Sequence, residues 1–166
     1  RWWNTRNTKT YVFNPSDPKS EATIINDRNY QDVYSDPGRF VQIKNKFNKN
    51  ILLIDENSTF TIGNGFTKNG QFPFLDKVNL SSGKSERVYQ SPYDDKYENI
   101  IDYDLIKNEI IVRIESPNEY PNYYKNSFKS GKLDQLTFFN NPFKSLQNIK
   151  KEIISYKRDD GLDLNG

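Results

Sequence analysis

Two Ser-Gly-Lys turns that lie 48 positions apart, at residues 82–84 and 130–132, constrain the fold more than any other feature of the sequence. Each turn stands between a run rich in aromatic or aliphatic residues and a more polar run, a pattern that predicts a β-hairpin. The predicted strand pairs are 75–80 with 84–90 and 122–128 with 133–138. A repeat of about 40 to 50 residues with about four short strands per unit is typical of β-propeller blades. An ordinary meander with similar glycine turns is the alternative.

Further strands are predicted because β-branched and aromatic runs alternate with turns rich in Asn, Asp, Pro and Gly. They are expected over residues 9–13, 21–25, 40–43, 51–54, 59–62, 99–103 and 109–115. The polar residues 26–40 are predicted to form a long loop. Ala22 is the single alanine, which disfavours helix, and only residues 145–151 resemble one. The prediction is an all-β fold, a partial β-propeller of about three blades of short antiparallel strands.

The last 15 residues, 152–166, predict a separate hairpin. A three-residue loop at 159–161 with Gly161 in the left-handed region sets Arg158 opposite Leu162, and Lys157 opposite Asp163 as a cross-strand charge pair. One face of this hairpin is then apolar and consists of Ile154, Tyr156, Leu162 and Leu164. The chain stops at Gly166 just after this hairpin and starts within an aromatic run, so we expect it to belong to a longer polypeptide.

Composition excludes several kinds of chemistry from the chain itself. Without Cys there is no disulfide or thiolate metal site, and without His there is no Ser-His-Asp triad, no His-ligated metal and no His base. The 24 basic and 22 acidic residues are interspersed, so no one-signed field favours nucleic acid or anionic lipid as a partner. No apolar run approaches the roughly 20 residues of a membrane helix. No cofactor is expected, and the compartment stays open, with periplasm or secretion slightly favoured over cytoplasm.

Four kinds of local pattern have both a functional and a structural interpretation, and the structural one is favoured for each. Gly63-Asn64-Gly65 resembles the start of a phosphate loop but lacks the residues that complete one, so a tight strand connection is expected. An acidic cluster could supply a glycosidase with paired carboxylates, or could lie on solvated faces; it consists of Asp94, Asp95, Glu98, Asp102 and Asp104. Asp55-Glu56-Asn57 and Asp159-Asp160-Gly161 resemble fragments of calcium loops without the full ligand set. Several aromatic residues could stack on sugars or bases, although we expect most of them to pack between blades. They are Trp2, Trp3, Tyr120, Tyr123 and Tyr124.

The glycosylation triplets at Asn57 and Asn79 are of the kind that an Asn-rich chain produces by chance, and no Gly-x-Ser-x-Gly nucleophile elbow occurs. No catalytic or metal-binding residue is therefore assigned, and the substrate-binding residues stay unknown.

Six short motifs occur in the order and at the distances seen in the prolyl oligopeptidase family of serine peptidases. They are Tyr34-Ser35-Asp36-Pro37-Gly38, Phe72-Pro73-Phe74-Leu75-Asp76, the segment from Glu115 to Tyr124, Leu136-Thr137-Phe138, Asn141-Pro142 and Tyr156-Lys157-Arg158-Asp159-Asp160-Gly161. The chain most resembles the glutamyl endopeptidase and acylaminoacyl-peptidase-like branch, over nearly its whole length. It departs from the family pattern at Glu119-Tyr120-Pro121, where two prolines are usual.

This resemblance implies a β-propeller followed by an α/β-hydrolase domain that carries the Ser-Asp-His triad. The chain then comprises propeller blades over 1–140, a connector over 141–151, and the first hairpin of the junction over 152–166. It would be a non-catalytic part of a peptidase that gates and orients peptide substrates, with the hydrolase domain of the same polypeptide as its partner. The alternatives are a stand-alone all-β binding module for glycan or protein, and a glycosidase that uses Asp94 and Asp95.

Overall fold

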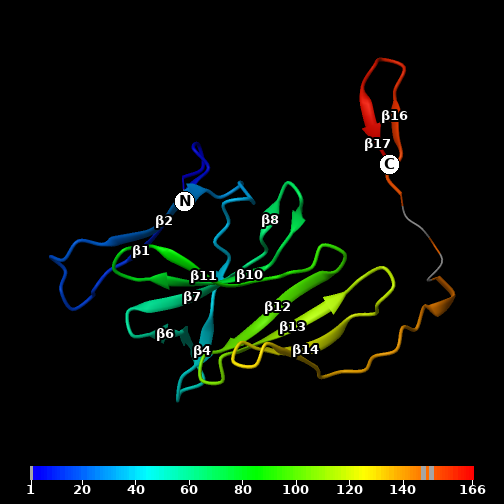
Figure 1. The fold of residues 1–166 in the computed structure, drawn as a ribbon. Coiled ribbons are helices and arrows are strands. Elements are labelled where there is room, and N and C mark those ends of the chain that lie inside the picture. The colour runs from blue at the N-terminus through cyan, green and yellow to red at the C-terminus, as the bar shows by residue number, and fades with distance from the viewer. Residues whose placement is uncertain (1, 147–148, 150–151) are drawn as a thin grey trace.

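The computed structural model describes residues 2–146, 149 and 152–166, and its regular structure is almost entirely β-strand (Figure 1). The exception within these ranges is a short 3-10 helix, η1, at Lys144–Leu146. The prediction of a helix over 145–151 therefore overlaps η1 at two positions, while residues 147, 148, 150 and 151 lie outside the described residues. The all-β prediction is confirmed.

One sheet has four antiparallel strands in sequence order: β12 (Tyr97–Asp104), β13 (Glu109–Glu115), β14 (Asn122–Ser127) and β15 (Lys132–Gln135). Side chains alternate along β13, so that Ile110, Val112 and Ile114 are buried. A β-bulge between Ile100 and Asp102 interrupts the pairing of β12 with β13 and turns Tyr103 into the core.

A second sheet has the order β11-β10-β7-β3, again a meander along the chain. Its strands are β3 (Arg39–Phe40), β7 (Ser58–Gly63), β10 (Phe74–Asn79) and β11 (Ser85–Gln90), and β6 (Ile54–Asp55) pairs with β7 on the side. In each sheet the first strand along the chain, β3 or β12, forms one edge and the last forms the other.

The two Ser-Gly-Lys turns occupy equivalent positions, because each joins the third and fourth strands of its sheet. The amide of Gly83 donates to the carbonyl of Asn79 at 2.9 Å, and the amide of Gly131 donates to the carbonyl of Ser127 at 2.8 Å. Both glycines have positive φ, 69° and 65°. In both turns the Lys amide donates to the Ser Oγ two residues earlier, at 3.3 Å. The sequence repeat is thus a repeat of structure.

Besides the terminal hairpin, the described residues form three two-stranded hairpins: β1 (Asn7–Val12) with β2 (Thr23–Asn29), β4 (Gln42–Lys44) with β5 (Asn50–Leu52), and β8 (Phe66–Thr67) with β9 (Gly70–Gln71). The predicted loop over 26–40 is wrong at its start, because β2 continues to Asn29. The side chains of Asn7 and Lys9 on β1 bind Asp27 across the ladder, at 2.7 and 2.9 Å, so polar pairs extend this strand where apolar alternation has stopped.

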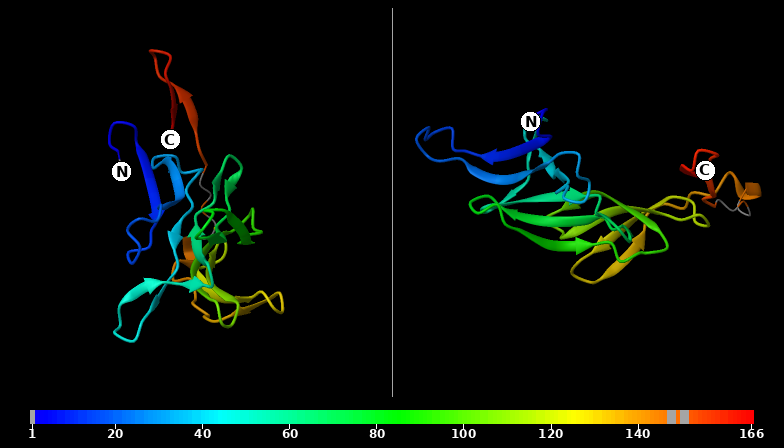
Figure 2. Two further views of the ribbon diagram at one scale, coloured as in Figure 1. Left: turned by 90° about the vertical axis from the view of Figure 1, so that its left-hand side faces the viewer. Right: turned by 90° about the horizontal axis from the view of Figure 1, so that it is seen from above.

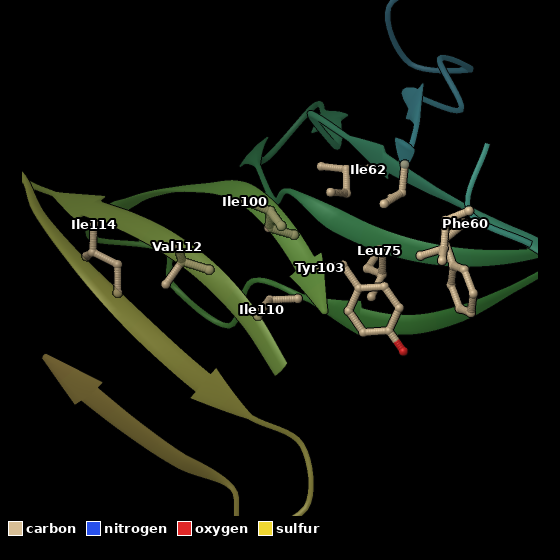
Figure 3. Close-up of a cluster of buried hydrophobic side chains, with 10 residues drawn as sticks. Phe60, Ile62, Leu75, Ile100, Tyr103, Ile110, Val112 and Ile114 are labelled. Carbon is tan, nitrogen blue, oxygen red and sulfur yellow. The ribbon is translucent and has the colours of Figure 1, made fainter. Parts of the chain in front are cut away.

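The hydrophobic core lies between the five-stranded β3–β11 sheet and the four-stranded β12–β15 sheet. Figure 3 shows Phe60, Ile62 and Leu75 of the β3–β11 sheet facing side chains of β12 and β13. The rings of Phe60 and Tyr103 approach to 4.9 Å between centroids, and Leu75 and Ile110 are fully buried. Burying a side chain of this size contributes about 1.5 to 3 kcal/mol. Packing between the sheets is therefore the main tertiary interaction.

The terminal hairpin, β16 (Ser155–Lys157) with β17 (Asp163–Asn165), has the predicted register. Tyr156 lies opposite Leu164, Lys157 opposite Asp163, and Gly161 has a φ of 87°. Figures 1 and 2 show this hairpin apart from the sheets. Ile154, Tyr156 and Leu162 on its apolar face are exposed. No helix within the described ranges is long and apolar enough to cross a membrane.

Candidate functional site

A partly buried ion pair between Arg28 of β2 and Asp36 forms the centre of the candidate site. The Arg28 Nη2 lies 3.1 Å from Asp36 Oδ1, and only 15% of the Arg28 side chain is exposed. The Arg28 Nη1 also donates to the backbone carbonyls of Asn29 and Asp32, at 3.1 and 3.0 Å. The guanidinium is therefore held from two sides and neutralised by one carboxylate.

The Asp36-Pro37-Gly38 turn is seated closely on the end of β7. Asp36 Oδ1 accepts a hydrogen bond of 2.9 Å from the Gly38 amide, which fixes the turn. Gly38 has a φ of 82°, and a Cβ at this position would lie 2.0 Å from the carbonyl oxygen of Ile62. Glycine is therefore required here for both its conformation and its size. The turn motif and the Gly63-Asn64-Gly65 motif, noted separately in the sequence, thus meet in space.

Two pockets share Arg28, Asp36 and Gly38 as lining residues. One has a volume of about 200 Å³ and lies between the β1–β2 hairpin and the β3–β11 sheet. Its lining includes Thr61, whose buried Oγ1 has no hydrogen-bond partner among the described residues. The other has a volume of about 400 Å³ and lies where β3 and β12, the first strands of the two sheets, approach each other. We call the second one the edge pocket.

The edge pocket is lined by hydrogen-bond donors that the fold leaves available. The Arg39 Nη2 donates to the carbonyl of Ile101 on β12 at 2.6 Å, which links the two sheet edges. Arg39 forms no ion pair with an acid in the described part of the chain. The side-chain amides of Asn64 and Asn99 also line this pocket, and neither has a side-chain hydrogen bond within the described residues. The pocket can therefore donate several hydrogen bonds to a ligand.

A buried carboxylate, Glu98, forms a second polar cluster between the sheets. Glu98 on β12 is 1% exposed, and its two carboxylate oxygens accept hydrogen bonds of 3.0 and 2.9 Å from the Tyr89 hydroxyl of β11. Burial raises the pKa of Glu98, although the Ser91 and Tyr89 hydroxyls oppose the shift. Burial and the charge of Glu98 also raise the pKa of Tyr89. This cluster links β11 to β12 by hydrogen bonds.

The five carboxylates of the acidic cluster do not converge on one site. Asp94, Asp95 and Asp102 are exposed, and Asp104 pairs with Lys107 at 3.2 Å. The solvated interpretation was wrong for Glu98, which is buried. This dispersed arrangement gives no support to a glycosidase with Asp94 and Asp95 as its catalytic pair.

The two fragments that resemble calcium loops serve as turns. Asp55 pairs with Lys77 at 2.8 Å, Glu56 has a positive φ of 52°, and Asp160 binds Arg158. Within the described ranges there is no group of three or more His, Cys, Asp or Glu side chains placed to hold a metal ion.

The Asn residues of both glycosylation triplets make hydrogen bonds within the fold. The Asn57 Nδ2 donates to Ser81 Oγ at 2.7 Å. The Asn79 Oδ1 accepts from the amides of Ser81 and Ser82 at 3.0 and 2.9 Å, so it shapes the turn before Gly83.

The aromatic residues divide into two groups. Trp2 and Trp3 are 60% and 74% exposed, so these two are not packed between strands of the described chain. The guanidinium of Arg6 lies 4.2 Å from the centroid of the Trp3 ring instead. Tyr124 packs against the core, Tyr123 is partly covered and Tyr120 is exposed.

Sequence reasoning did not identify Arg28, Arg39 or Tyr89. Arg28 and Arg39 lie at the two ends of a segment predicted to be a loop, and no motif marks them. The sequence did contain a signal that Glu98 is buried. Glu98 lies two residues before the apolar Ile100 on β12, and residues two apart on a strand point to the same face of the sheet.

Comparison with curated proteins decides which proteins the chain resembles. A protein from Oryza sativa subsp. japonica named probable glutamyl endopeptidase, chloroplastic, is 32% identical over 177 residues, which cover 98% of this chain and 19% of the relative. A protein of the same name from Arabidopsis thaliana is 29% identical, covering 98% of this chain and 18% of the relative. The chain is similar to a segment of glutamyl endopeptidases. The predicted resemblance to glutamyl endopeptidase is therefore confirmed.

The similarity to glutamyl endopeptidase extends along nearly the whole chain, from the first strands to the terminal hairpin, but the chain spans less than one fifth of the length of these relatives. No protein-family model matches the sequence. No solved structure matches it either.

Proposed function

We propose that this chain is the non-catalytic β-propeller part of a serine peptidase of the prolyl oligopeptidase family. In this proposal residues 1–140 form propeller blades, 141–151 a connector and 152–166 the first hairpin of a junction to an α/β-hydrolase domain with the Ser-Asp-His triad. The observation that carries the proposal is the similarity of 98% of the chain to proteins named glutamyl endopeptidase. The same similarity favours a peptidase over a stand-alone binding module.

The repeated sheets give structural support to the propeller. The four-stranded β12–β15 sheet packs on the five-stranded sheet that precedes it in the chain, and in each sheet the last two strands are joined by a turn with the same hydrogen bonds. The β1–β2 hairpin precedes them in the position that the last two strands of another blade would take. The apolar face of β16 and β17 supports a junction, because 54% of Tyr156 is exposed here and a neighbouring domain would cover it.

The role of such a propeller is to control access to the hydrolase pocket. The chain contains no His, so it cannot supply the imidazole of the triad. Blades over the pocket would admit peptides and unfolded segments and exclude folded proteins, and donors on the inner sheet edges would orient a bound peptide.

Deletion of the blades from the whole peptidase tests this role. We expect the deletion to raise cleavage of a large folded protein relative to cleavage of a short peptide, because the barrier to entry is removed. The two rates are measured side by side. Labelling of the active-site serine with a small fluorophosphonate serves as the control that the hydrolase domain is intact. An unchanged ratio of the two rates in a protein that is still labelled contradicts gating.

A further inference from the structure

The β4–β5 hairpin projects from the molecule and ends in a basic tip with an exposed aromatic ring (Figures 1 and 2). The tip carries Phe47, which is 71% exposed, and three exposed lysines, Lys44, Lys46 and Lys49. Residues 42–54 contain no Asp or Glu, and these lysines form no ion pair within the part of the chain that the structure describes. Basic and acidic residues are balanced over the whole chain, but this hairpin is positively charged.

Hydrogen bonds hold Phe47 in its exposed position. The Asn45 Oδ1 accepts from the amides of Phe47 and Lys49, at 2.9 and 3.0 Å. The Asn45 amide donates to the carbonyl of Lys49 at 2.9 Å, and Asn48 has a positive φ of 57°. The Lys46 Nζ lies 5.0 Å from the centroid of the Phe47 ring. The fold therefore presents an apolar tip with lysines beside it.

A second connection at the same end of the molecule repeats this pattern. The turn between β12 and β13 carries Ile106, which is 92% exposed, and Lys107, which pairs with Asp104 at the surface. The base of the β4–β5 hairpin is hydrogen-bonded to the backbone of Phe60, and the Phe60 ring lies 4.9 Å from the ring of Tyr103, just before this turn. Figure 1 shows both connections at the bottom of the molecule, whereas the terminal hairpin lies at the upper right. The proposed junction to a hydrolase domain therefore leaves this end uncovered.

We propose that the β4–β5 hairpin docks on an anionic lipid surface. Aromatic rings favour the interface between headgroups and acyl chains, and lysines beside an anionic leaflet are attracted to its headgroups. The long lysine side chains can reach the phosphates while Phe47 lies deeper. A single hairpin of this kind gives reversible association and not a permanent anchor. The inference goes beyond the proposed function and does not depend on peptidase activity.

The shape of the hairpin favours a lipid surface over an acidic protein. A protein partner must offer a preformed pocket for a projecting ring, and its anchor residues gather in one contiguous patch. Here the two apolar tips, Phe47 and Ile106, stand on separate turns at the same end. Lipid headgroups move apart around each tip, so a membrane needs no matching pocket.

Co-sedimentation of the whole protein with lipid vesicles tests the proposal. The vesicles consist either of phosphatidylcholine alone or of phosphatidylcholine and phosphatidylglycerol in equal parts. We expect the wild type to bind the anionic vesicles and not the neutral ones, and to be released by salt, because the attraction between exposed charges is screened.

Two variants separate charge from insertion. The triple variant Lys44→Gln, Lys46→Gln, Lys49→Gln is expected to weaken binding to anionic vesicles by about a hundredfold, because three favourable charges are lost. Phe47→Ser keeps the charges and should weaken binding by about tenfold, since no ring enters the interface. Neither variant removes a buried side chain, so both should retain the melting temperature of the wild type.

The β8–β9 hairpin provides the matched control. It also has an exposed phenylalanine and an exposed lysine, Phe66 and Lys68, but it lies at the top of Figure 1, away from the β4–β5 hairpin. The double variant Phe66→Ser, Lys68→Gln should therefore bind anionic vesicles as the wild type does. An equal loss of binding in this control overturns the assignment to the β4–β5 hairpin.

Failure of the wild type to bind anionic vesicles, or equal binding to neutral ones, also overturns the proposal. Unchanged binding by Phe47→Ser overturns insertion of the ring. A soluble polyglutamate peptide is the competing probe. If it binds the wild type, loses binding in the triple lysine variant, and the vesicles do not bind, the hairpin is assigned to an acidic protein partner instead. Vesicle binding is measured without turnover, so loss of peptidase activity is a separate result that bears on the proposed function.

Discussion

Gly38→Ala is expected to destabilise the protein by about 3 kcal/mol or more, because backbone strain adds to a steric clash. A φ of 82° is unfavourable for alanine by itself, and the Cβ of an alanine at position 38 would lie 2.0 Å from the carbonyl oxygen of Ile62. That oxygen belongs to the backbone of β7, so the contact cannot be relieved by a change of rotamer. The turn must move away from the strand, which opens the edge pocket and disturbs the Arg28–Asp36 pair.

Gly131→Ala is the matched control for this experiment. Gly131 also has a positive φ, 65°, but a Cβ there would meet nothing within 4 Å. We expect only the cost of the left-handed conformation, about 1 to 2 kcal/mol. Urea denaturation of both variants measures the difference. Equal destabilisation by the two substitutions would mean that the turn at Gly38 is not held closely against β7.

The sequence predicted those parts of the fold in which turn chemistry and alternation agree. In the terminal hairpin, the glycine and the alternating apolar residues both require the same register, and Tyr156 lies opposite Leu164 as expected. The two Ser-Gly-Lys turns likewise identified the third and fourth strands of both sheets. These are local signals, and each strand involved pairs with its neighbour in the chain.

Prediction of strands from the sequence failed where strand pairing depends on polar side chains. The end of β2 was predicted to be a loop because Asn26 to Asn29 show no apolar alternation, yet Asp27 is bound by side chains of β1. The short β8–β9 hairpin was missed because the turn at Asn69-Gly70 is flanked by too few apolar residues.

The candidate site could not be predicted for a different reason. The pocket is made by residues from β2, β3, β7 and β12, and its position depends on how two sheets pack. Glu98 shows the same limit. If side chains alternated regularly along β12, Glu98, Ile100 and Asp102 would all be buried. The β-bulge after Ile100 breaks this alternation, so that Asp102 is exposed and Tyr103 is buried. Without the position of the bulge, the sequence does not say which end of the strand follows the pattern.

Tyr89→Phe is expected to destabilise the protein by about 2 kcal/mol at neutral pH, because the buried Glu98 carboxylate loses the Tyr89 hydroxyl as a donor. The Tyr89 ring stacks on Phe128 at 5.6 Å between centroids, and phenylalanine preserves this contact. The loss therefore reports the hydrogen bonds of 3.0 and 2.9 Å rather than packing. Urea denaturation at pH 7 and at pH 4 measures it, and the cost should be smaller at pH 4, where Glu98 binds a proton more readily.

The pH dependence follows from the direction of the Glu98 shift. The pKa of Glu98 in the folded protein is raised above its ordinary value of 4.5, so the folded state binds the proton more tightly than the unfolded state. The free energy of unfolding that this group contributes is therefore highest below pH 4.5, and it falls as pH rises through the raised pKa. Glu98→Gln should remove this slope, because the amide does not titrate and its oxygen still accepts from Tyr89.

Combining the two substitutions separates charge from hydrogen bonding. If the buried negative charge of Glu98 is what destabilises the fold, Tyr89→Phe should lower the free energy of unfolding more in the wild type than in the Glu98→Gln variant. The amide of that variant leaves no unpaired anion between the sheets when the Tyr89 hydroxyl is removed. At pH 7 Glu98→Gln itself should be at least as stable as the wild type. A Glu98→Gln protein that is less stable at every pH, with the same slope as the wild type, would show that the carboxylate is fully compensated in the folded state. The contact between β11 and β12 would then be equally strong with Glu98 ionised or protonated.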